Sequence, residues 1–227
     1  MRKILITGAS SKIGDMLTKY FLKNNDFVIY HYFKNCKSFT EYENIEMIQC
    51  DFTNLNKVNK VFKKVFSEHD IDIVINNANL YTTNNLIQEE ILNNINYKTP
   101  ELINQLYVME KKEIGCIINI TDCRIFLKNI DNNTSFYYNS KKKLSELTKK
   151  QTFEFKDKCR INAIALGAVT ANKDLDEDQQ KLCKESLLGH CVRISDIIRT
   201  IEFLHKNSSI CGQEIILDCG RNYFLSK

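Results

Sequence analysis

The sequence predicts a doubly wound α/β fold, in which helices cover both faces of a parallel sheet. Two observations carry this prediction. Short apolar runs alternate with longer amphipathic stretches along the chain of 227 residues, and a glycine-containing turn directly follows the first apolar run. Strand–helix alternation is typical of covered parallel sheets, and folds of this class bind phosphate groups at the first turn.

Seven apolar runs fit strands and six amphipathic patterns fit helices. The predicted strands are Ile4–Ile6, Phe27–Tyr32, Ile45–Gln49, Ile71–Ile75, Cys116–Ile120, Arg160–Ala165 and Glu214–Leu217. The predicted helices cover about residues 13–23, 55–67, 85–110, 138–155, 174–187 and 195–205. Because no linker or repeat interrupts them, we expect a single domain over residues 1–227 with a Rossmann-like sheet of about seven strands.

Composition excludes several classes of partner. The 32 Lys and Arg are interleaved with 28 Asp and Glu, for a net charge of +4, so no basic stripe indicates nucleic-acid binding. No stretch approaches the ~20 apolar residues of a membrane span, and we expect no membrane partner. The nine cysteines are odd in number and lack CxxC spacing. We therefore expect no metal site, and reduced thiols in a cytoplasmic protein.

The first turn has the features of a phosphate-binding loop. Thr7–Gly14 joins the first predicted strand to the first predicted helix. Glycine lets the backbone approach a phosphate closely, and the free N–H groups and dipole of a helix N-terminus favour negative charge. The candidate binding residues are Gly8, Ser10, Ser11, Lys12, Ile13 and Gly14.

A tyrosine and a lysine four residues apart form the candidate catalytic pair. Tyr137 and Lys141 fall on one face of a predicted helix, so both side chains reach the same site. A nearby ammonium lowers the pKa of a phenol, and we expect Lys141 to do this for Tyr137. Tyr138 with Lys142 has the same spacing, but the register of the neighbouring residues favours Tyr137 with Lys141.

Together these motifs resemble the short-chain dehydrogenases/reductases. Thr7–Gly14 is similar to the TGxxxGxG loop of that family, with Lys12 at the middle glycine, and Asn76–Asn79 is similar to its NNAG, with Asn79 for glycine. Tyr137–Lys141 has the form Y-x-x-S-K. The resemblance runs from residue 3 to about 222, ending on matches at Asn162–Gly167, Gly212–Gln213 and Asp218–Gly220.

The resemblance implies roles for residues at matching positions. Asp51 would contact the adenine amino group, Lys141 would hold the nicotinamide ribose, and Asn96 would anchor a water that links Lys141 to solvent. Further cofactor contacts are implied for Phe52, Asn77, Ala78, Thr121, Gly167 and Val169. The resemblance also implies a homotetramer.

The end of the second predicted strand favours NADPH over NADH. An NAD enzyme places an acid here to bind the ribose 2′-hydroxyl. This sequence has Tyr32-Phe33-Lys34 and no acid. Lys34 and Lys12 would attract a 2′-phosphate, which a carboxylate would repel.

Asp122 stands where the family has its catalytic serine. A serine hydroxyl can donate to a ketone oxygen, whereas an ionised aspartate can only accept. Asp122 therefore suits a substrate with N–H donors. Pteridine reductases and dihydromonapterin reductases, the branch this sequence resembles, have aspartate here. Tyr81 falls where that branch has an aromatic residue that stacks on the pterin.

We therefore expect NADPH-dependent reduction of a C=N bond in a dihydropterin or dihydrofolate, carried by Tyr137, Lys141, Asp122 and Asn96. One alternative is a ketoreductase of the same family, for example on a 3-oxoacyl thioester. Another is a non-catalytic NADPH-binding regulator. Residues 171–190 match no chemical motif, and His190 and Cys191 are interpreted as structural.

Overall fold

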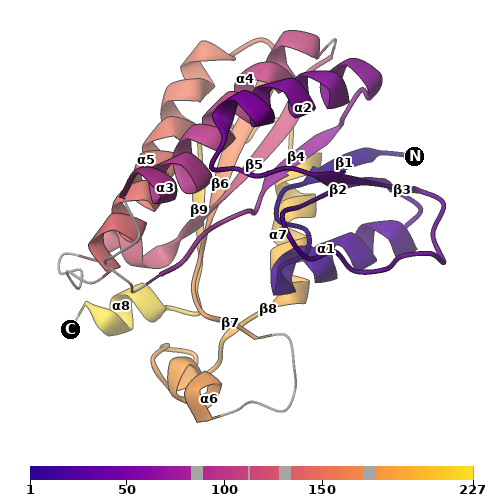
Figure 1. Ribbon diagram of the computed structural model, residues 1–227. Helices are drawn as coiled ribbons and strands as arrows, with labels where there is room; N and C mark the ends of the chain where they lie inside the picture. Colours follow the sequence, from indigo (N-terminus) through magenta and orange to yellow (C-terminus); the bar gives the residue numbers. More distant parts are fainter. Residues whose placement is uncertain (83–88, 112, 128–133, 171–176, 227) are drawn as a thin grey trace.

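Seven strands form one sheet at the centre of the computed structural model, in the order β3-β2-β1-β4-β5-β6-β9. The structure describes residues 1–82, 89–111, 113–127, 134–170 and 177–226. Every neighbouring pair of strands is parallel, so their carboxyl ends meet at one edge of the sheet (Figure 1). The strands are β1 (Lys3–Ile6), β2 (Phe27–Tyr32), β3 (Ile45–Gln49), β4 (Ile73–Asn76), β5 (Gly115–Asp122), β6 (Cys159–Leu166) and β9 (Glu214–Leu217).

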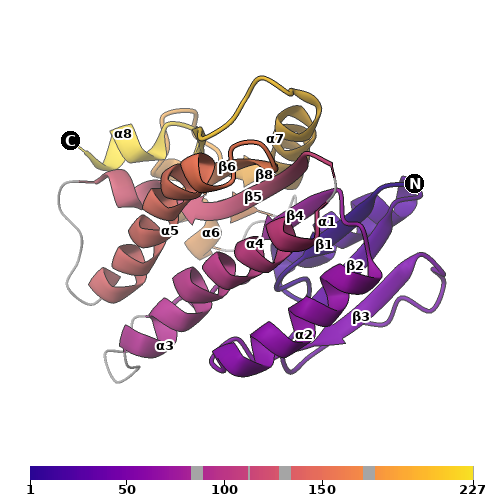
Figure 2. The same cartoon turned by 90° about the horizontal axis from the view of Figure 1, so that it is seen from above.

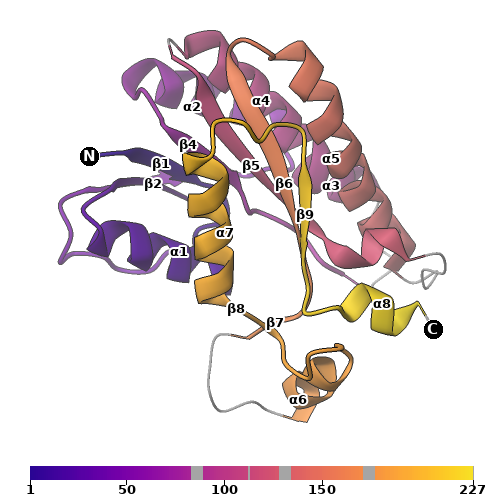
Figure 3. The ribbon, with the colours of Figure 1, turned by 180° about the vertical axis from the view of Figure 1, so that it is seen from behind.

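Two apolar clusters fasten helices to the two faces of the sheet. On one face, α1 (Lys12–Lys23) and α7 (Ile194–Lys206) contribute Leu17, Phe21, Ile197 and Ile201 (Figure 3). On the other, α2 (Leu55–Glu68) and α4 (Thr99–Glu110) contribute residues such as Phe62 and Tyr107, with α5 (Ser135–Glu154) beside them (Figure 2). The predicted α/β class, the seven parallel strands and the helices on both faces are confirmed. Among the described residues, no helix is both long and apolar enough to cross a membrane.

The helix predicted over residues 85–110 is divided. α3 (Glu89–Asn93) leads into a π-helix at Asn94–Lys98, and α4 follows from Thr99. Pro100 lies in the first turn of α4, directly after the π-helix, and has no N–H to donate to the turn before it. The helix predicted over 174–187 corresponds to α6 (Glu177–Lys184). The predicted residues 85–88 and 174–176 lie outside the described residues.

Several short elements are absent from the sequence prediction. A 3-10 helix at Cys123–Phe126 follows β5, and α8 (Arg221–Leu225) lies near the C-terminus. β7 (Val169–Thr170) and β8 (Val192–Arg193) pair in parallel, with Val169 opposite Val192. The two strands of this second sheet precede and follow α6 in the sequence. α6 itself lies beyond the carboxyl edge of the main sheet (Figure 3).

The expectation that all cysteines are reduced thiols is wrong for one pair. Cys183 of α6 and Cys191, directly before β8, form a disulfide with their Cα atoms 4.7 Å apart. The chain folds back after α6 and brings the two residues within bridging distance. The eight-residue separation of the pair resembles no metal or redox motif, so the sequence contained no signal for it.

Candidate active site

A pocket of about 520 Å³ opens where β1, β2, β3 and β4 end. Its volume is typical of a site for a small molecule or cofactor. Nine of the residues expected to bind the cofactor line it, and the described lining comprises Gly8, Ser10, Ser11, Lys12, Ile13, His31, Phe33, Cys50, Asp51, Phe52, Thr53, Asn77, Ala78, Asn79, Leu80, Ile91 and Ile95.

Two glycines allow the loop between β1 and α1 to close tightly. Gly8 has a positive φ of 61°, and a Cβ added there would lie 2.7 Å from the Cα of Ala78. A Cβ on Gly14 would lie 2.5 Å from the carbonyl oxygen of Gly8. A side chain at either position would force the backbone apart, so the packing of the loop against β4 requires glycine.

Asn77 holds the loop from the end of β4. Its Nδ2 donates to the carbonyl oxygens of Thr7 and Gly8 at 2.9 and 3.0 Å. Ser11 caps α1, and its Oγ accepts from the N–H of Gly14 at 3.1 Å. The N–H groups of Lys12 and Ile13, in the first helical turn, have no preceding helical carbonyl to bind. The loop therefore presents N–H donors suited to an anion.

The residues expected near the 2′-phosphate and the adenine lie on two other segments. Lys34 is exposed, with its Nζ 5.2 Å from the ring centroid of Phe33, which lines the pocket. Tyr32 instead packs against the core beneath α1. Asp51 lines the pocket, and its Oδ1 accepts from the N–H and Oγ1 of Thr53 at 2.9 and 2.8 Å.

β5 and α5 bring the candidate catalytic side chains together. The hydroxyl of Tyr137 donates to Oδ2 of Asp122 at 3.2 Å. One helical turn further along α5, the Nζ of buried Lys141 donates to the carbonyl oxygen of Ile120 at 2.9 Å. α5 packs directly on β5, so the spacing of Tyr137 and Lys141 places both at the end of that strand (Figure 1).

Burial shifts the pKa of each of these three groups. It lowers the pKa of Lys141 from 10.5 to about 8, against the opposing effect of Asp122. It raises the pKa of Asp122, and it raises that of Tyr137 well above 10, helped by the Asp122 charge. The expectation that the pKa of Tyr137 is lowered is therefore wrong here, because burial and the Asp122 charge raise it, while Nζ of Lys141 donates to Ile120. Tyr137 is a protonated phenol, a form able to donate.

Aromatic rings flank Tyr137 on two sides. Tyr81 is 52% exposed and meets the Tyr137 ring edge-on, with centroids 4.9 Å apart and an interplanar angle of 85°. Tyr138 meets it at 4.9 Å and 73°. The guanidinium of Arg124 lies 4.9 Å from the Tyr138 centroid. The exposed face that Tyr81 contributes is available to a flat substrate.

The side chain of Asn96 is engaged with protein atoms. Its Nδ2 donates to the carbonyl oxygen of Leu80 at 3.1 Å and to Oγ of Ser140 at 3.0 Å, and its Oδ1 accepts from the N–H of Leu80 at 2.8 Å. Asn96 thus ties the segment after β4 to α5 beside Tyr137. A role in anchoring a water stays a prediction.

Three other expected cofactor residues lie at the end of β5, directly after β6 and in β7. Thr121 is buried and donates through Oγ1 to Glu214 at 2.5 Å. A Cβ on Gly167 would lie 2.7 Å from the Cα of Asp218, so this turn requires glycine. Val169 is half-buried in β7. Their contact with a cofactor remains a prediction.

Glu214 and His31 lie near the site but were not among the residues that the sequence predicted to be functional. Glu214, on β9, accepts from Thr121 of β5 and Ser145 of α5. His31, on β2, accepts from the N–H of Gly8. Each is a polar residue in a predicted strand that is otherwise mostly apolar. A polar residue at such a position indicates a buried hydrogen bond, but it does not identify the partner.

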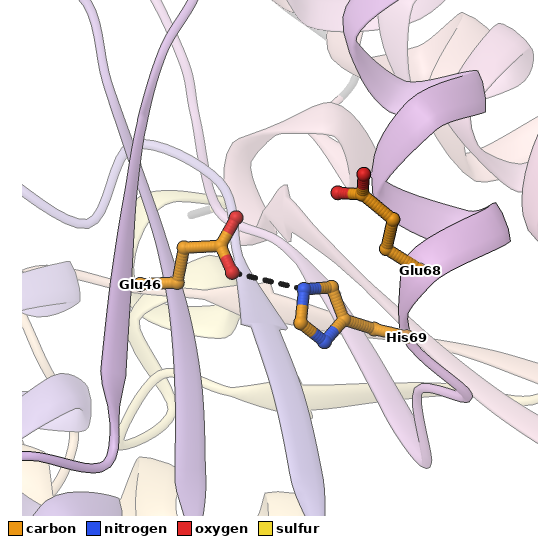
Figure 4. Close-up of side chains that lie close together, drawn as sticks. All are labelled: Glu46, Glu68 and His69. Atoms are coloured by element: carbon orange, nitrogen blue, oxygen red, sulfur yellow. Dashed lines mark hydrogen bonds and ion pairs between the residues drawn. The ribbon is translucent and has the colours of Figure 1, made fainter.

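Three residues of types that can bind a metal ion lie close together, apart from the pocket. His69, at the end of α2, pairs through Nε2 with Glu46 at 2.9 Å, and Glu68 lies near them (Figure 4). The two glutamate side chains are 42% and 49% exposed. α2 ends at the amino edge of the sheet, opposite the pocket. The His69–Glu46 hydrogen bond lies near the surface, where pairs of this kind contribute little to stability.

Comparison with known proteins supports the interpretation of the fold. The short chain dehydrogenase family model matches residues 2–181. An uncharacterised oxidoreductase of Saccharomyces cerevisiae is 38% identical over 77 residues, which are 33% of this chain and only 25% of that protein.

Solved structures are similar over nearly the whole chain. FolM alternative dihydrofolate reductase 1 from Brucella canis, complexed with NADP, has a TM-score of 0.85 at 22% identity, covering 98% of this chain and 94% of that one. ElxO with NADP bound has a TM-score of 0.84 at 24% identity, covering 100% of this chain and 99% of that one. 4-Hydroxyisoleucine dehydrogenase, complexed with NADH, has a TM-score of 0.82 at 24% identity, covering 97% of each chain. Since the family model matches more than half of the chain, the protein belongs to the short chain dehydrogenase family of oxidoreductases.

Proposed function

We propose that this protein uses NADPH to reduce a C=N bond of a dihydropterin or dihydrofolate. One observation carries the proposal: the Oδ2 of Asp122 accepts a hydrogen bond from the hydroxyl of Tyr137. A carboxylate beside the proton donor suits a substrate that presents N–H groups and takes a proton on nitrogen. It disfavours a ketone, whose oxygen gains negative charge during reduction.

The pocket suits the pyrophosphate and adenosine portion of a dinucleotide. The first-turn N–H groups of α1 suit the pyrophosphate, and Lys12 beside them adds a positive charge. Lys34 follows β2, and residues 33–40 contain no acid. When bound, NADPH supplies a hydride from the nicotinamide C4. The similar FolM and ElxO structures contain NADP, which supports this choice, although similar folds also bind NADH.

The chain's own residues would deliver the proton. Burial keeps Tyr137 protonated, so its hydroxyl can donate to the imine nitrogen while the adjacent carbon receives the hydride. Asp122 would accept from ring N–H groups of the substrate and orient Tyr137. Lys141, one turn along α5, would hold the nicotinamide ribose. Tyr81 would stack on the flat ring.

The test is NADPH oxidation by the purified protein with three substrates: a dihydropterin, dihydrofolate and an acetoacetyl thioester. We expect kcat/KM for at least one of the first two to exceed that for the thioester tenfold or more. Turnover of the thioester alone would assign the protein to the ketoreductases. NADPH binding without turnover of any substrate would favour a non-catalytic regulator.

A further inference from the structure

We propose that His31 is a positioning residue for the cofactor, whose imidazole fastens the phosphate loop to the adenosine side of the pocket. This inference rests on the proposed NADPH site. It concerns a residue that the family motifs discussed above do not include. His31 acts through the backbone segments that surround the cofactor, because both of its ring nitrogens are occupied by protein atoms.

His31 lies inside the sheet at the edge of the pocket. It is 3% exposed, near the end of β2, and lines the pocket. Side chains alternate along a strand. Tyr30 and Tyr32 point to the cluster under α1, so His31 points to the opposite face, toward Phe52 and Phe62. A polar ring in this apolar layer requires partners for both nitrogens.

The partners of the ring nitrogens define its protonation state. Nδ1 lies 3.0 Å from the N–H of Gly8, which can only donate. Nε2 lies 3.0 Å from the carbonyl oxygen of Cys50, which can only accept. The imidazole is therefore neutral, with its proton on Nε2. Burial lowers the pKa of His31 to about 4, so this form persists through the neutral range.

The imidazole joins three segments that line one pocket. The N–H groups of Gly8 and Ala9 in the phosphate loop donate to Nδ1 and to the carbonyl oxygen of His31, at 3.0 and 2.8 Å. The turn after β3 supplies the Cys50 carbonyl and the ring of Phe52, which stacks on His31 at 4.0 Å and 8°. A site held in place before binding loses less entropy when the ligand binds.

This geometry predicts a particular pattern of binding defects. His31 supports segments that would meet the pyrophosphate and adenosine, which NADPH and NADH share. A substitution should therefore weaken both cofactors by the same factor and leave their ratio unchanged. Lys34, which carries a charge after β2, is the matched contrast, because Lys34→Gln should change the ratio.

The experiment measures Kd for NADPH and NADH, together with kcat at saturating NADPH, for the full-length protein and its variants. His31→Leu removes both ring hydrogen bonds, so the loop has to be ordered when the cofactor binds, and we expect Kd to rise by about tenfold for both cofactors. kcat should change less than about twofold, because hydride transfer occurs elsewhere. His31→Asn, which retains a donor and an acceptor, should recover part of the loss.

Controls separate this role from general stability. His205→Leu alters a half-buried histidine of α7 and should leave both Kd values unchanged. Nitrogen NMR of the wild-type ring should show Nδ1 unprotonated and Nε2 protonated at neutral pH. That measurement decides the proposal if His31→Leu does not fold.

Three results distinguish the possible failures. A folded His31→Leu protein with wild-type Kd values overturns the inference, and so does a proton on Nδ1. Unequal effects on NADPH and NADH would also contradict it. If the wild-type protein binds neither cofactor, the proposed function itself fails.

Discussion

At the residue scale, the hydroxyl of Tyr137 donates a hydrogen bond to Oδ2 of Asp122 at 3.2 Å. Asp122→Ser removes the charge and the strong acceptor but keeps a hydrogen-bonding group. Pterin or folate reduction should fall on the order of 10²-fold, as when a positioned acid–base group is lost. Reduction of the thioester should not fall. Assays of both substrates with this one variant test the prediction. An equal loss of both activities, together with a lower melting temperature, would show that Asp122 only stabilises the end of β5.

Tyr137→Phe removes the phenolic donor and little else. We expect kcat to fall by about 10²-fold or more, because proton transfer acts in the transition state. The Kd for NADPH should stay within about twofold of wild type, which fluorescence titration can measure. Tyr138→Phe is the matched control and should keep most of its activity. Full turnover by Tyr137→Phe would show that another group donates the proton.

Lys141 makes the stability of the protein depend on pH. Its pKa falls from 10.5 in the open chain to about 8 when folded, so the unfolded chain binds more protons between these values. Stability from this group therefore rises with pH across that window. Relative to Lys141→Met, wild type should gain on the order of 3 kcal/mol between about pH 7 and about pH 10.5 in urea unfolding. If the free energies of unfolding of wild type and Lys141→Met changed equally with pH, the prediction would be refuted. Lys142→Met, which alters an exposed lysine, is the control and should follow the pH dependence of wild type.

At the element scale, Glu214 ties three elements together. Its carboxylate on β9 accepts from Thr121 of β5 and Ser145 of α5. Glu214→Ala leaves both hydroxyls without this partner, and we expect the free energy of unfolding to fall by about 2–3 kcal/mol. Gln213→Ala, at the exposed neighbouring position, should change it by less than about 0.5 kcal/mol. Denaturant titration of both variants makes the comparison, and equal losses would contradict it.

The strands could be predicted because a buried parallel strand needs an apolar run, and each of the seven runs became one. Helix boundaries were harder. The change from α3 to a π-helix and then α4 leaves the apolar spacing nearly intact, so periodicity alone predicts one helix. The pair β7 and β8 is only two residues long in each strand, too short to leave a pattern. The Cys183–Cys191 disulfide depends on how the chain folds back after α6.

The candidate site was predictable where local spacing defines geometry. Gly8 and Gly14 at a strand–helix turn, and Tyr137 with Lys141 one helical turn apart, are such cases. Partners far apart in sequence were not predictable. Nothing in the run containing His31 shows that its ring meets Gly8, and the spacing of Tyr137 and Lys141 does not show that Nζ of Lys141 donates to Ile120. The roles assigned to Asn96 and Val169, and the single domain over residues 1–227, stay predictions.

At the scale of the whole molecule, NADPH should stabilise the fold, because the proposed cofactor site is made of several segments that unfolding separates. At about 100 times Kd the gain is about 2.7 kcal/mol, which corresponds to a rise in melting temperature of roughly 5–10 °C for a chain of this size. NADH at the same concentration should give a smaller rise. Thermal shift experiments measure both, and equal shifts would contradict the cofactor preference assigned to Lys12 and Lys34. By family analogy we also propose a homotetramer, which light scattering can test.

The strand order has a consequence for how the chain folds as it is synthesised. The adjacent strands β3, β2, β1 and β4 all come from Lys3–Asn76, so half of the sheet can pair while the rest is still being made. β4, an Ile-Val-Ile-Asn run, must keep one edge unpaired until Gly115–Asp122 arrives. Unpaired apolar edges recruit other chains. We therefore expect this edge to expose the nascent chain to aggregation during translation.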